Sequence, residues 1–399
     1  MKKYMYFICL LFCCFLMIDT SMAAAKESQS YIRVGLLKAQ DSVEITANND
    51  FVVKDVDNDQ NYKFKRMEDV KISQKDKTVY VNKKGKQTTT LIVAVKENAP
   101  VIVNGKRYRG NLIIQPHRAG LTVINRLPMD EYLYGVLPEE MPANWNMEAL
   151  KAQAVAARSF ALYYKQDRKH AREGYDVCAT TDCQVYGGMD SEATTTNNAV
   201  KATSGQVLVY ANEPICAVFH AASGGSTENS IDVWGVNVPY LRAVDDQDEN
   251  SPYKDWIVQM SNEDFSRLIK KHYKDIGLIK EIDMSKIMQK NPPSNKKSTI
   301  KFIGSNKGSV ELTRAEIRDL LNFKSSNFVI QTNMDNKKSK NSNVLKLDKD
   351  DKNLVFLGQG LGHRLGMSQW GAKALADKGQ NYKQILYHYY SGVNLQTMY

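Results

Sequence analysis

Cysteine, histidine and long apolar runs are all scarce in this chain. Six cysteines occur among 399 residues, and three of them stand within the first fourteen positions. The other three, Cys178, Cys183 and Cys216, are too few and odd in number for a scaffold held by disulfides. Beyond the first 25 residues no apolar run is long enough to cross a membrane. With only six histidines as well, a cluster of histidine and cysteine becomes informative.

The N-terminus carries the pattern of an export segment. Lys2 and Lys3 precede an apolar run from Tyr4 to Ile18, and three alanines at 23–25 offer a small-residue cleavage site. This pattern predicts that residues 1–25 are a signal peptide, or an uncleaved N-terminal membrane anchor if the residues after Ile18 are included. Either alternative places the rest of the chain outside the cytoplasm, on the cell membrane or secreted.

The net charge of +10 comes mostly from lysine spread along the chain rather than from an arginine stripe. This pattern disfavours nucleic acid as a partner. For an exported chain, anionic cell-wall polymers or membrane headgroups are better candidates, and a solvated lysine surface is the structural alternative. A hydrophobic content of 43% predicts a globular protein with a sizeable core.

The hydrophobic pattern predicts a mixed α+β fold. Residues 26–125 contain short β-branched runs separated by polar turns, which predicts a β-rich part with antiparallel sheets. A core is expected over 126–290, a Lys/Asn-rich insert over 291–350 with mobile loops around a small packed unit, and a Gly-rich block over 351–399 that completes the core. Helices are expected near 192–204 and over 262–290.

The stretch from Leu137 onward has two parts. Pro138 and Pro142 bracket Glu139 and Glu140, which predicts a rigid loop because proline fixes φ and lacks a backbone donor. An alanine-rich helix is expected to follow from near Met147, capped by Asn146 and packed against that loop. From the residues alone, a surface loop with two solvated acids and a loop that carries a general acid both remain open.

Three blocks in order resemble the stage II sporulation protein D family. They are Pro138-Glu-Glu-Met-Pro with Trp145 and Glu148–Arg158, then Phe219–Glu228, then Gly358–Ala372. The resemblance runs with gaps from about Tyr108 to the C-terminus, and three long blocks are more specific than a short motif. The family comprises peptidoglycan lytic transglycosylases and shares its domain with amidase-enhancer proteins.

The resemblance implies that Glu140, the carboxylate directly before Met-Pro, is the catalytic acid. A lytic transglycosylase manages with one carboxylate, because the C6 hydroxyl of muramic acid attacks its own anomeric carbon and gives a 1,6-anhydro end. No cofactor is needed for this chemistry. Glu139 is expected to be solvated, since neighbouring side chains of an extended loop alternate.

The other two blocks are expected to bind substrate. A phosphate-loop interpretation fails because no Gly-Lys-Ser/Thr follows, and a Ser223–His220 dyad lacks the nucleophile-elbow spacing. The family pattern usually has Gly, Val and Tyr where Arg364, Leu365 and Trp370 stand. The predicted contacts are His220, Ser223, Gly224, Gly225, Thr227, Glu228, His363, Ser368, Gln369 and Trp370.

A third feature resembles the zinc-binding loop of part of this family. His170 precedes Cys178 and Cys183, and thiolate and imidazole ligands suit one structural zinc ion. Family members often have His immediately before the second cysteine, and here Asp182 stands in its place as the candidate fourth ligand. A Cys178–Cys183 disulfide is the alternative for an exported protein.

The sequence therefore predicts a lytic transglycosylase that cleaves the bond between N-acetylmuramic acid and N-acetylglucosamine. The resemblance implies a role in sporulation engulfment, beside a peptidoglycan amidase and membrane-protein partners. Two alternatives remain open: a noncatalytic wall-binding amidase enhancer, and a hydrolytic muramidase with Glu228 as base. Cleavage requires contacts that hold the sugar against the acid, so we expect Glu140 and the two later blocks to share one groove.

Overall fold

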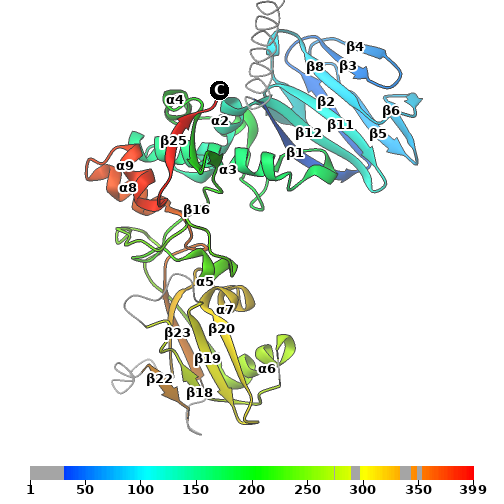
Figure 1. Ribbon diagram of the computed structural model, residues 1–399. Helices are drawn as coiled ribbons and strands as arrows, with labels where there is room; N and C mark the ends of the chain where they lie inside the picture. Colours follow the sequence, from blue (N-terminus) through cyan, green and yellow to red (C-terminus); the bar gives the residue numbers. More distant parts are fainter. Residues whose placement is uncertain (1–30, 274, 289–296, 333–342, 348–352) are drawn as a thin grey trace, which may run out of the picture. The chain divides into compact units, whose positions relative to one another are not determined.

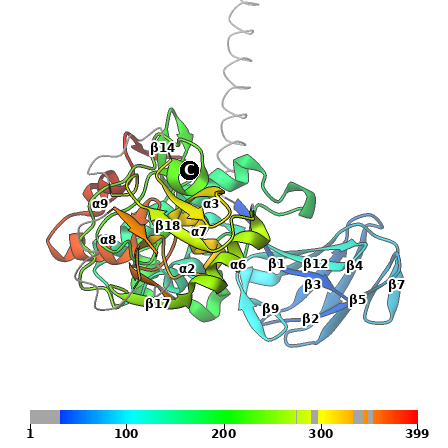
Figure 2. The same cartoon turned by 90° about the horizontal axis from the view of Figure 1, so that it is seen from below.

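The computed structural model describes residues 31–273, 275–288, 297–332, 343–347 and 353–399. The described residues form two compact units, one from 31–216 with 394–399 and the other from 217–393 (Figures 1 and 2). Each unit is described by itself. Residues 1–25, predicted to be a signal peptide or anchor, lie outside the described residues. Among the described residues, no helix is both long and apolar enough to span a membrane.

The first unit begins with two antiparallel sheets that lie one against the other (Figure 1). Alternate residues of these strands are buried, as in β3 and β8, so each sheet buries one face. The seven-stranded sheet has the order β13-β1-β12-β11-β8-β3-β4, and the six-stranded sheet has the order β10-β9-β2-β5-β6-β7. The strands are β1 (Tyr31–Gln40), β2 (Ser42–Ala47), β3 (Phe51–Asp55), β4 (Gln60–Phe64), β5 (Val70–Lys75), β6 (Thr78–Val81), β7 (Lys84–Lys86), β8 (Leu91–Val95), β9 (Val101–Val103), β10 (Lys106–Tyr108), β11 (Asn111–His117), β12 (Gly120–Pro128) and β13 (Val177–Cys178).

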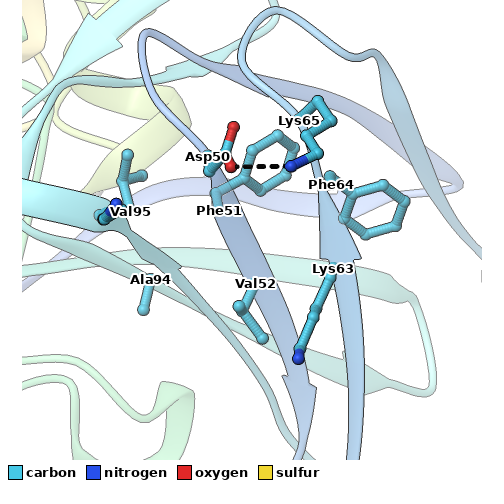
Figure 3. Close-up of a pocket in the computed structure, with 9 residues that line it drawn as sticks. Asp50, Phe51, Val52, Lys63, Phe64, Lys65, Ala94 and Val95 are labelled. Atoms are coloured by element: carbon cyan, nitrogen blue, oxygen red, sulfur yellow. Dashed lines mark hydrogen bonds and ion pairs between the residues drawn. The ribbon is translucent and has the colours of Figure 1, made fainter.

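This double sheet confirms the predicted β-rich N-terminal part. We call it the N-terminal sandwich, residues 31–128. Its strands pair antiparallel except where β13 joins β1 in parallel. A hollow of about 430 Å³ lies where β3, β4 and β8 run side by side, and Figure 3 shows Lys63 beside Val52 there.

Helices follow the sandwich in the first unit. They are α2 (Met129–Glu140), α3 (Met147–Asp167) and α4 (Thr194–Ala202), and a three-stranded sheet of β14 (Gln206–Tyr210), β15 (Glu213–Pro214) and β25 (Asn394–Thr397) closes the unit. The predicted alanine-rich helix and its cap are confirmed, because the Asn146 side chain accepts a hydrogen bond from the Glu148 N–H at 3.0 Å. The alanines are fully buried, which lets α2 and α4 pack closely on α3.

The second unit contains its own hydrophobic core. Trp256, Phe265, Phe302, Phe328 and Phe356 belong to one buried cluster. Its strands form one sheet of β17-β23-β21 and another of β20-β19-β18-β22. The elements are β16 (Phe219–His220), α5 (Ser230–Trp234), β17 (Trp256–Ser261), α6 (Asn262–His272), β18 (Ile279–Asp283), β19 (Thr299–Gly304), β20 (Ser309–Thr313), α7 (Arg314–Leu321), β21 (Asn327–Gln331), β22 (Val344–Lys346), β23 (Asn353–Gln359), β24 (Met367–Ser368), α8 (Gln369–Asp377) and α9 (Tyr382–Tyr389).

This core sets boundaries that differ from those expected from composition. Residues 256–288 and 353–359 pack with residues 297–332, so the small packed unit begins well before position 291. The predicted 126–290 core is divided between the two units at Cys216. The prediction of helix over 262–290 is correct only for α6, because Ile279–Asp283 alternates buried and exposed residues as β18. The predicted mobile loops at 291–296 and 333–342 lie outside the described residues.

Candidate active site and metal centre

Glu140 is the last residue of α2, and this position corrects the predicted loop. The helix continues through Pro138 and ends where the Met141 N–H donates to the Leu137 carbonyl at 2.9 Å. A proline inside a helix costs about 3 kcal/mol. Burial of a large apolar side chain contributes about 1.5–3 kcal/mol, and α2 fully buries Leu133, Val136 and Leu137. Packing of the apolar face therefore outweighs the proline.

The helix also changes how the two acids separate. Successive side chains on a helix lie about 100° apart rather than on opposite sides. Glu139 is exposed, and one of its oxygens accepts a hydrogen bond from the Ser191 hydroxyl. Glu140 is half-buried and is followed by Met141, which is 1% exposed. The separation of a solvated and a sheltered acid thus arises from helix geometry.

Tyr132 stands two turns before Glu140 in α2 and contacts the loop that carries Cys178 and Cys183. Its hydroxyl donates to the Gln184 side-chain oxygen at 3.1 Å. Burial raises the pKa of Tyr132 well above its ordinary value, and the nearby Cys183 and Glu140 raise it further. Tyr132 is therefore a neutral hydrogen-bond donor at any physiological pH, and Gln184 fixes its orientation.

A buried arginine fixes the other end of α2. Arg158 of α3 is 0% exposed, and its guanidinium donates to Asp130 at 2.9 and 3.1 Å. It also contacts the Tyr399 hydroxyl at 3.0 Å and the backbone carbonyl of Gln206 at 3.2 Å. Asp130 stands in the first turn of α2. A buried charge needs this many partners, so the network holds α2, α3 and the C-terminal strand in one arrangement.

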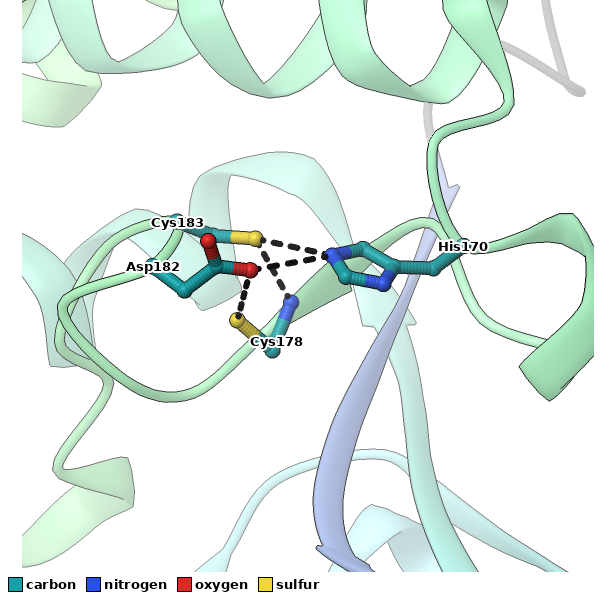
Figure 4. Close-up of side chains that lie close together, drawn as sticks. All are labelled: His170, Cys178, Asp182 and Cys183. Carbon is teal, nitrogen blue, oxygen red and sulfur yellow. Dashed lines mark hydrogen bonds and ion pairs between the residues drawn. The ribbon is translucent and has the colours of Figure 1, made fainter. Parts of the chain in front are cut away.

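The predicted metal ligands come together in the structure. One donor atom from each of His170, Cys178, Asp182 and Cys183 lies within 4.8 Å of the other three (Figure 4). The His170 Nε2 atom is 3.3 Å from the Cys183 Sγ and 3.7 Å from the Asp182 Oδ2, which is 3.8 Å from the Cys178 Sγ. Tetrahedral zinc with bonds of about 2.0–2.3 Å has ligand separations of about 3.3–3.8 Å. The donor set and its spacing fit one zinc ion.

The chemistry of the two thiols also suits a metal. Both sulfurs are free, so the alternative disulfide is not formed in this structure. The hydrogen bond with Cys183 lowers the pKa of Cys178 to about 5, and the pair gives up its first proton readily. Lys169 contacts Asp182 at 3.1 Å, and His170 stacks on Tyr175 with ring centroids 4.8 Å apart. These contacts hold two of the four donors in place.

The loop that carries these donors joins the sandwich to α2. Cys178 lies in β13, which pairs with Gly35 of β1, and it packs with Ile124 and Tyr175. Gln184, next to Cys183, contacts Tyr132. The loop therefore supports the helix that ends at Glu140.

The two later blocks meet within the second unit. β16 and β24 pair in parallel, with Phe219 opposite Met367 and His220 opposite Ser368. The His220 Nδ1–H donates to the Leu365 carbonyl at 3.1 Å. Two of the three blocks thus form one structure. Glu140 belongs to the first unit, so convergence of all three stays a prediction.

Most of the side chains and backbone groups that were predicted to contact sugar form hydrogen bonds within this unit instead. Ser223 donates to Asp246 at 2.6 Å, and Asp248 accepts from the Gly224 and Gly225 N–H groups at 2.8 Å each. Thr227 is 2% exposed and its hydroxyl accepts from the Val244 N–H, while Ser368 caps α8 by accepting from the Gly371 N–H. These groups hold the loops together.

Glu228 is also enclosed. It is 7% exposed and contacts Arg314 at 2.8 Å, Arg364 at 3.0 Å and Ser326 at 2.9 Å. Burial alone would raise its pKa, but the two arginines and Ser326 together lower it. Arg364, at φ 63°, stands where the family usually has glycine, and its guanidinium fills the space beside Glu228. Glu228 is a structural carboxylate here, which disfavours its role as a hydrolytic base.

Among the predicted contacts in the two later blocks, few are exposed to solvent and accessible to a substrate. Gly225 is exposed and a Cβ added there would meet nothing within 4 Å, while His363 and Trp370 are partly exposed. Gln369 is 8% exposed. Burial and Arg318 lower the pKa of His363 to about 4, so it is a neutral ring at neutral pH. These positions are the best remaining candidates for substrate contact.

Two buried polar groups in the family blocks lack a partner among the described residues. They are the side-chain amide of Gln153, which is 0% exposed, and the Nε2 atom of His220, which is 5% exposed. An unsatisfied buried polar group costs about 1–3 kcal/mol, and such exceptions call for a functional explanation. Sequence reasoning missed Gln153, together with Tyr132, Gln184 and Asp248. Their polar character beside the predicted motifs was the available signal.

Comparison with known proteins agrees with this arrangement. The family model of the stage II sporulation protein matches residues 117–210, which contain Glu140, Arg158 and the four clustered donors. Stage II sporulation protein D of Bacillus amyloliquefaciens is 30% identical over 286 residues, covering 68% of this chain and 75% of that protein. The chain belongs to the stage II sporulation protein D family.

Other relatives extend the comparison. An uncharacterised protein of Brachyspira hyodysenteriae is 33% identical over 297 residues, or 73% of each chain. The amidase enhancer of Bacillus subtilis is 32% identical over 311 residues. That match covers 66% of this chain but only 40% of the enhancer's length. The family thus includes proteins whose names refer to sporulation and to amidase enhancement.

Proposed function

We propose that the protein is a peptidoglycan lytic transglycosylase with Glu140 as its single acid and base. The observation that carries the proposal is a half-buried carboxylate at the C-terminal end of a fixed helix, beside buried Met141 and Tyr132. The negative end of the helix dipole and the apolar neighbours both disfavour an ionised carboxylate. A general acid must hold its proton near neutral pH, and this position favours that form.

The reaction needs two proton transfers at one carboxyl group. Glu140 first donates its proton to the glycosidic oxygen as the bond from that oxygen to the anomeric carbon of N-acetylmuramic acid breaks. The C6 hydroxyl of the same sugar then attacks the anomeric carbon and passes its proton to Glu140. No water is consumed, the products are a 1,6-anhydro end and a free hydroxyl, and the acid is restored.

The clustered donors His170, Cys178, Asp182 and Cys183 are proposed to hold one structural zinc ion. When bound, zinc supplies no step of the reaction and only ties the four donors together. The chain's own residues do the positioning, since Gln184 follows Cys183 and its side chain fixes Tyr132 on α2. Stability of the loop is thereby linked to placement of Glu140.

The cellular role is also a proposal. The names of the Bacillus relatives favour a role in sporulation. We propose that this role is engulfment, in which an amidase removes stem peptides and this chain cleaves the glycan strands. The predicted export segment would place it at the outer face of the membrane, beside membrane-protein partners. The resemblance gives no reason to expect nucleic acid as a substrate.

A noncatalytic amidase enhancer is the second candidate. The observation in its favour is the match to the Bacillus subtilis amidase enhancer over 311 residues. In that case Glu140 would contribute to wall binding and the chain would release no glycan fragments. The chain would instead raise the rate of an amidase on the same wall.

Product analysis separates these functions. Purified protein is incubated with glycan strands stripped of stem peptides, and the fragments are identified by mass spectrometry. A transglycosylase gives fragments with 1,6-anhydro ends, which are about 18 mass units lighter than reducing ends because no water is added. Reducing ends would indicate a hydrolase. Intact strands together with stimulation of an added amidase would support the enhancer and overturn the proposal.

A further inference from the structure

A second hollow lies at the open side of the N-terminal sandwich, away from the proposed active site. It measures about 730 Å³ and is lined by β4, the end of β6 and the start of β7, with one residue of β5. β4 is the last strand of one sheet and β7 the last strand of the other. β12 leads into α2, and β4 is the fourth strand from β12 in the same sheet. With neighbouring strands about 4.7–4.9 Å apart, β4 lies about 19 Å from β12. We call this hollow the lysine groove.

The lysine groove concentrates positive charge without counter-ions. Lys63, Lys71, Lys83 and Lys84 line it, and no acidic residue and no arginine does so. Among the described residues, none of these four ammonium groups lies within 4.0 Å of a carboxylate oxygen. Lys54 in the same sheet is paired, at 3.3 Å from Asp59. The Lys84 ammonium group lies over the ring of Tyr62, 5.9 Å from its centroid, which leaves its charge in place. Four ammonium groups without a carboxylate partner around one hollow attract anions.

The charge of the chain is divided unevenly between its parts. Residues 31–128 contain 18 Lys and Arg against 10 Asp and Glu, a difference of +8, whereas residues 129–216 contain 7 against 12, a difference of −5. Lysine is spread widely along the chain, but the acidic residues that balance it are not. The sandwich is basic and the part that holds Glu140 is acidic, so a polyanion would bind the former and be repelled by the latter.

The residues of the groove indicate the class of anion. Lysine presents a compact point charge that suits phosphate oxygens, while planar carboxylates are usually recognised by the bidentate fork of arginine. Gln60, Asn61 and Asn82 add amide groups that can bind hydroxyls. Lysines without arginine, combined with amides, suit a phosphate polymer whose charges alternate with hydroxyl-bearing units.

The neighbouring hollow extends the track. It shares Lys63 and Phe64 with the lysine groove and adds Lys65 and Lys96. Its charge is partly neutralised, because Lys65 lies 3.2 Å from Asp50 (Figure 3) and Lys96 lies 3.9 Å from Glu97. A repeating polymer can occupy both hollows at once, and linked contacts raise its affinity above that of a single phosphate. A membrane surface fits less well, since Val56 and Met67 are the exposed large apolar side chains among the described residues of the sandwich.

We propose that the lysine groove binds a phosphate-bearing polymer of the cell wall and anchors the protein there. The inference rests on the proposed location outside the cytoplasm, but not on the activity of Glu140. Binding so far from α2 would hold the protein at the wall while leaving Glu140 available to glycan strands. The groove is thus a second binding site, with a ligand different from the substrate.

The test is direct binding of the full chain to purified polyglycerol phosphate, measured by fluorescence anisotropy at several salt concentrations. The logarithm of the affinity should fall linearly with the logarithm of salt. The triple variant Lys63→Gln/Lys71→Gln/Lys84→Gln should bind about tenfold more weakly or worse. The matched control Lys75→Gln/Lys86→Gln/Lys106→Gln changes the same charge at exposed positions outside the groove and should stay within about twofold. Glu140→Gln should bind like the wild type, so loss of catalysis cannot mimic loss of binding.

Lysine footprinting locates the contact without a variant. The wild-type chain is acetylated with and without the polymer, and modification is followed by mass spectrometry. Protection of Lys63, Lys71 and Lys84, but not of Lys75 and Lys106, supports the groove. Equal loss of affinity in both triple variants would mean diffuse charge attraction and overturn the proposal. Equal binding to phosphate-free peptidoglycan, or binding only to anionic vesicles, would also overturn it.

Discussion

At the scale of the residue, Glu139 and Glu140 are consecutive in α2, yet the rotation of about 100° between them places two identical groups in different environments. Glu139 is exposed and contacts Ser191, while Glu140 is half-buried beside Met141. The substitution Glu140→Gln keeps the size of the side chain and removes its proton. It should reduce glycan cleavage by about 10²–10⁴-fold or more, with unchanged wall binding and melting temperature.

Glu139→Gln is the matched control for this prediction. It should retain most of the activity, because an exposed side chain bonded to Ser191 does not contact the proposed reaction site. Both variants are compared by counting anhydro ends released per minute. If Glu139→Gln is the inactive one, Glu139 is the acid and the assignment from the family match is off by one residue.

Arg158 gives a second prediction at this scale. Its guanidinium is fully buried and satisfied by Asp130, Tyr399 and two backbone carbonyls. Arg158→Ala removes the cationic partner of Asp130, which keeps the hydroxyls of Tyr399 and Ser204 as donors. The substitution should lower the free energy of unfolding by about 3–5 kcal/mol. Denaturant unfolding followed by circular dichroism measures this loss.

Lys151→Ala on the same helix is the control for Arg158. Lys151 is partly exposed and pairs with Glu148 on the helix surface, so its loss should cost at most about 1 kcal/mol. A similar small cost for both variants would show that the buried network does not hold α2 in place.

At the scale of the element, the loop from His170 to Gln184 couples a metal centre to α2. Purified reduced protein should contain about one zinc per chain, because four donor atoms of the types that zinc prefers lie within 4.8 Å of one another. Chelation should lower the melting temperature, and activity should fall only to the extent that the loop loosens. Elemental analysis and thermal unfolding provide the two readouts.

Asp182 allows a sharper version of this prediction. Asp182→His restores the ligand type that the family often has and should retain zinc, whereas Asp182→Ala should lose it more readily to a chelator. Wild-type protein without metal but with both thiols oxidised would establish the disulfide instead. Cys216 is buried outside the cluster and serves as an internal standard for thiol titration.

At the scale of the whole molecule, buried His220 and partly exposed His363 make the stability of the second unit depend on pH. Burial, His363 and Arg364 lower the pKa of His220, and burial with Arg318 lowers that of His363 to about 4. An unfolded chain binds these protons near pH 6.5. Since the folded pKa values lie below the unfolded ones, the stabilisation is complete above about pH 6.5 and is lost as the pH falls toward 4.

Tryptophan fluorescence can follow this loss, because three of the four tryptophans, Trp234, Trp256 and Trp370, lie in the second unit. Its melting temperature should fall by several degrees between pH 7.5 and 4.5, at about 2–4 °C per kcal/mol for a domain of this size. His363→Gln should weaken the pH dependence, and His272→Gln, at an exposed position of α6, should not. A pH-independent melting temperature would show that neither histidine is held neutral.

The sequence by itself determined the elements whose signal is local. The short β-branched runs of residues 26–125 became strands, and the alanine-rich helix began at its Asn146 cap, because pattern and capping act within a few residues. The order of the three blocks determined the family. The resemblance to the family's zinc-binding loop predicted that His170, Cys178 and Cys183 lie together, and their short separation in sequence is compatible with this.

Only the tertiary structure decided the rest. α2 runs through Pro138 because its buried face packs on α3 and α4. The preferences of the residues near Pro138 do not reveal this packing. Glu228 became a structural carboxylate because Arg314 and Arg364 reach it across 86 and 136 residues of sequence. The small packed unit took in residues on both sides of the expected insert, because burial of aromatic side chains rather than composition sets a domain boundary. Long-range contacts of this kind depend on the complete fold. A local sequence pattern contains one of the two residues in each contact and does not identify the other.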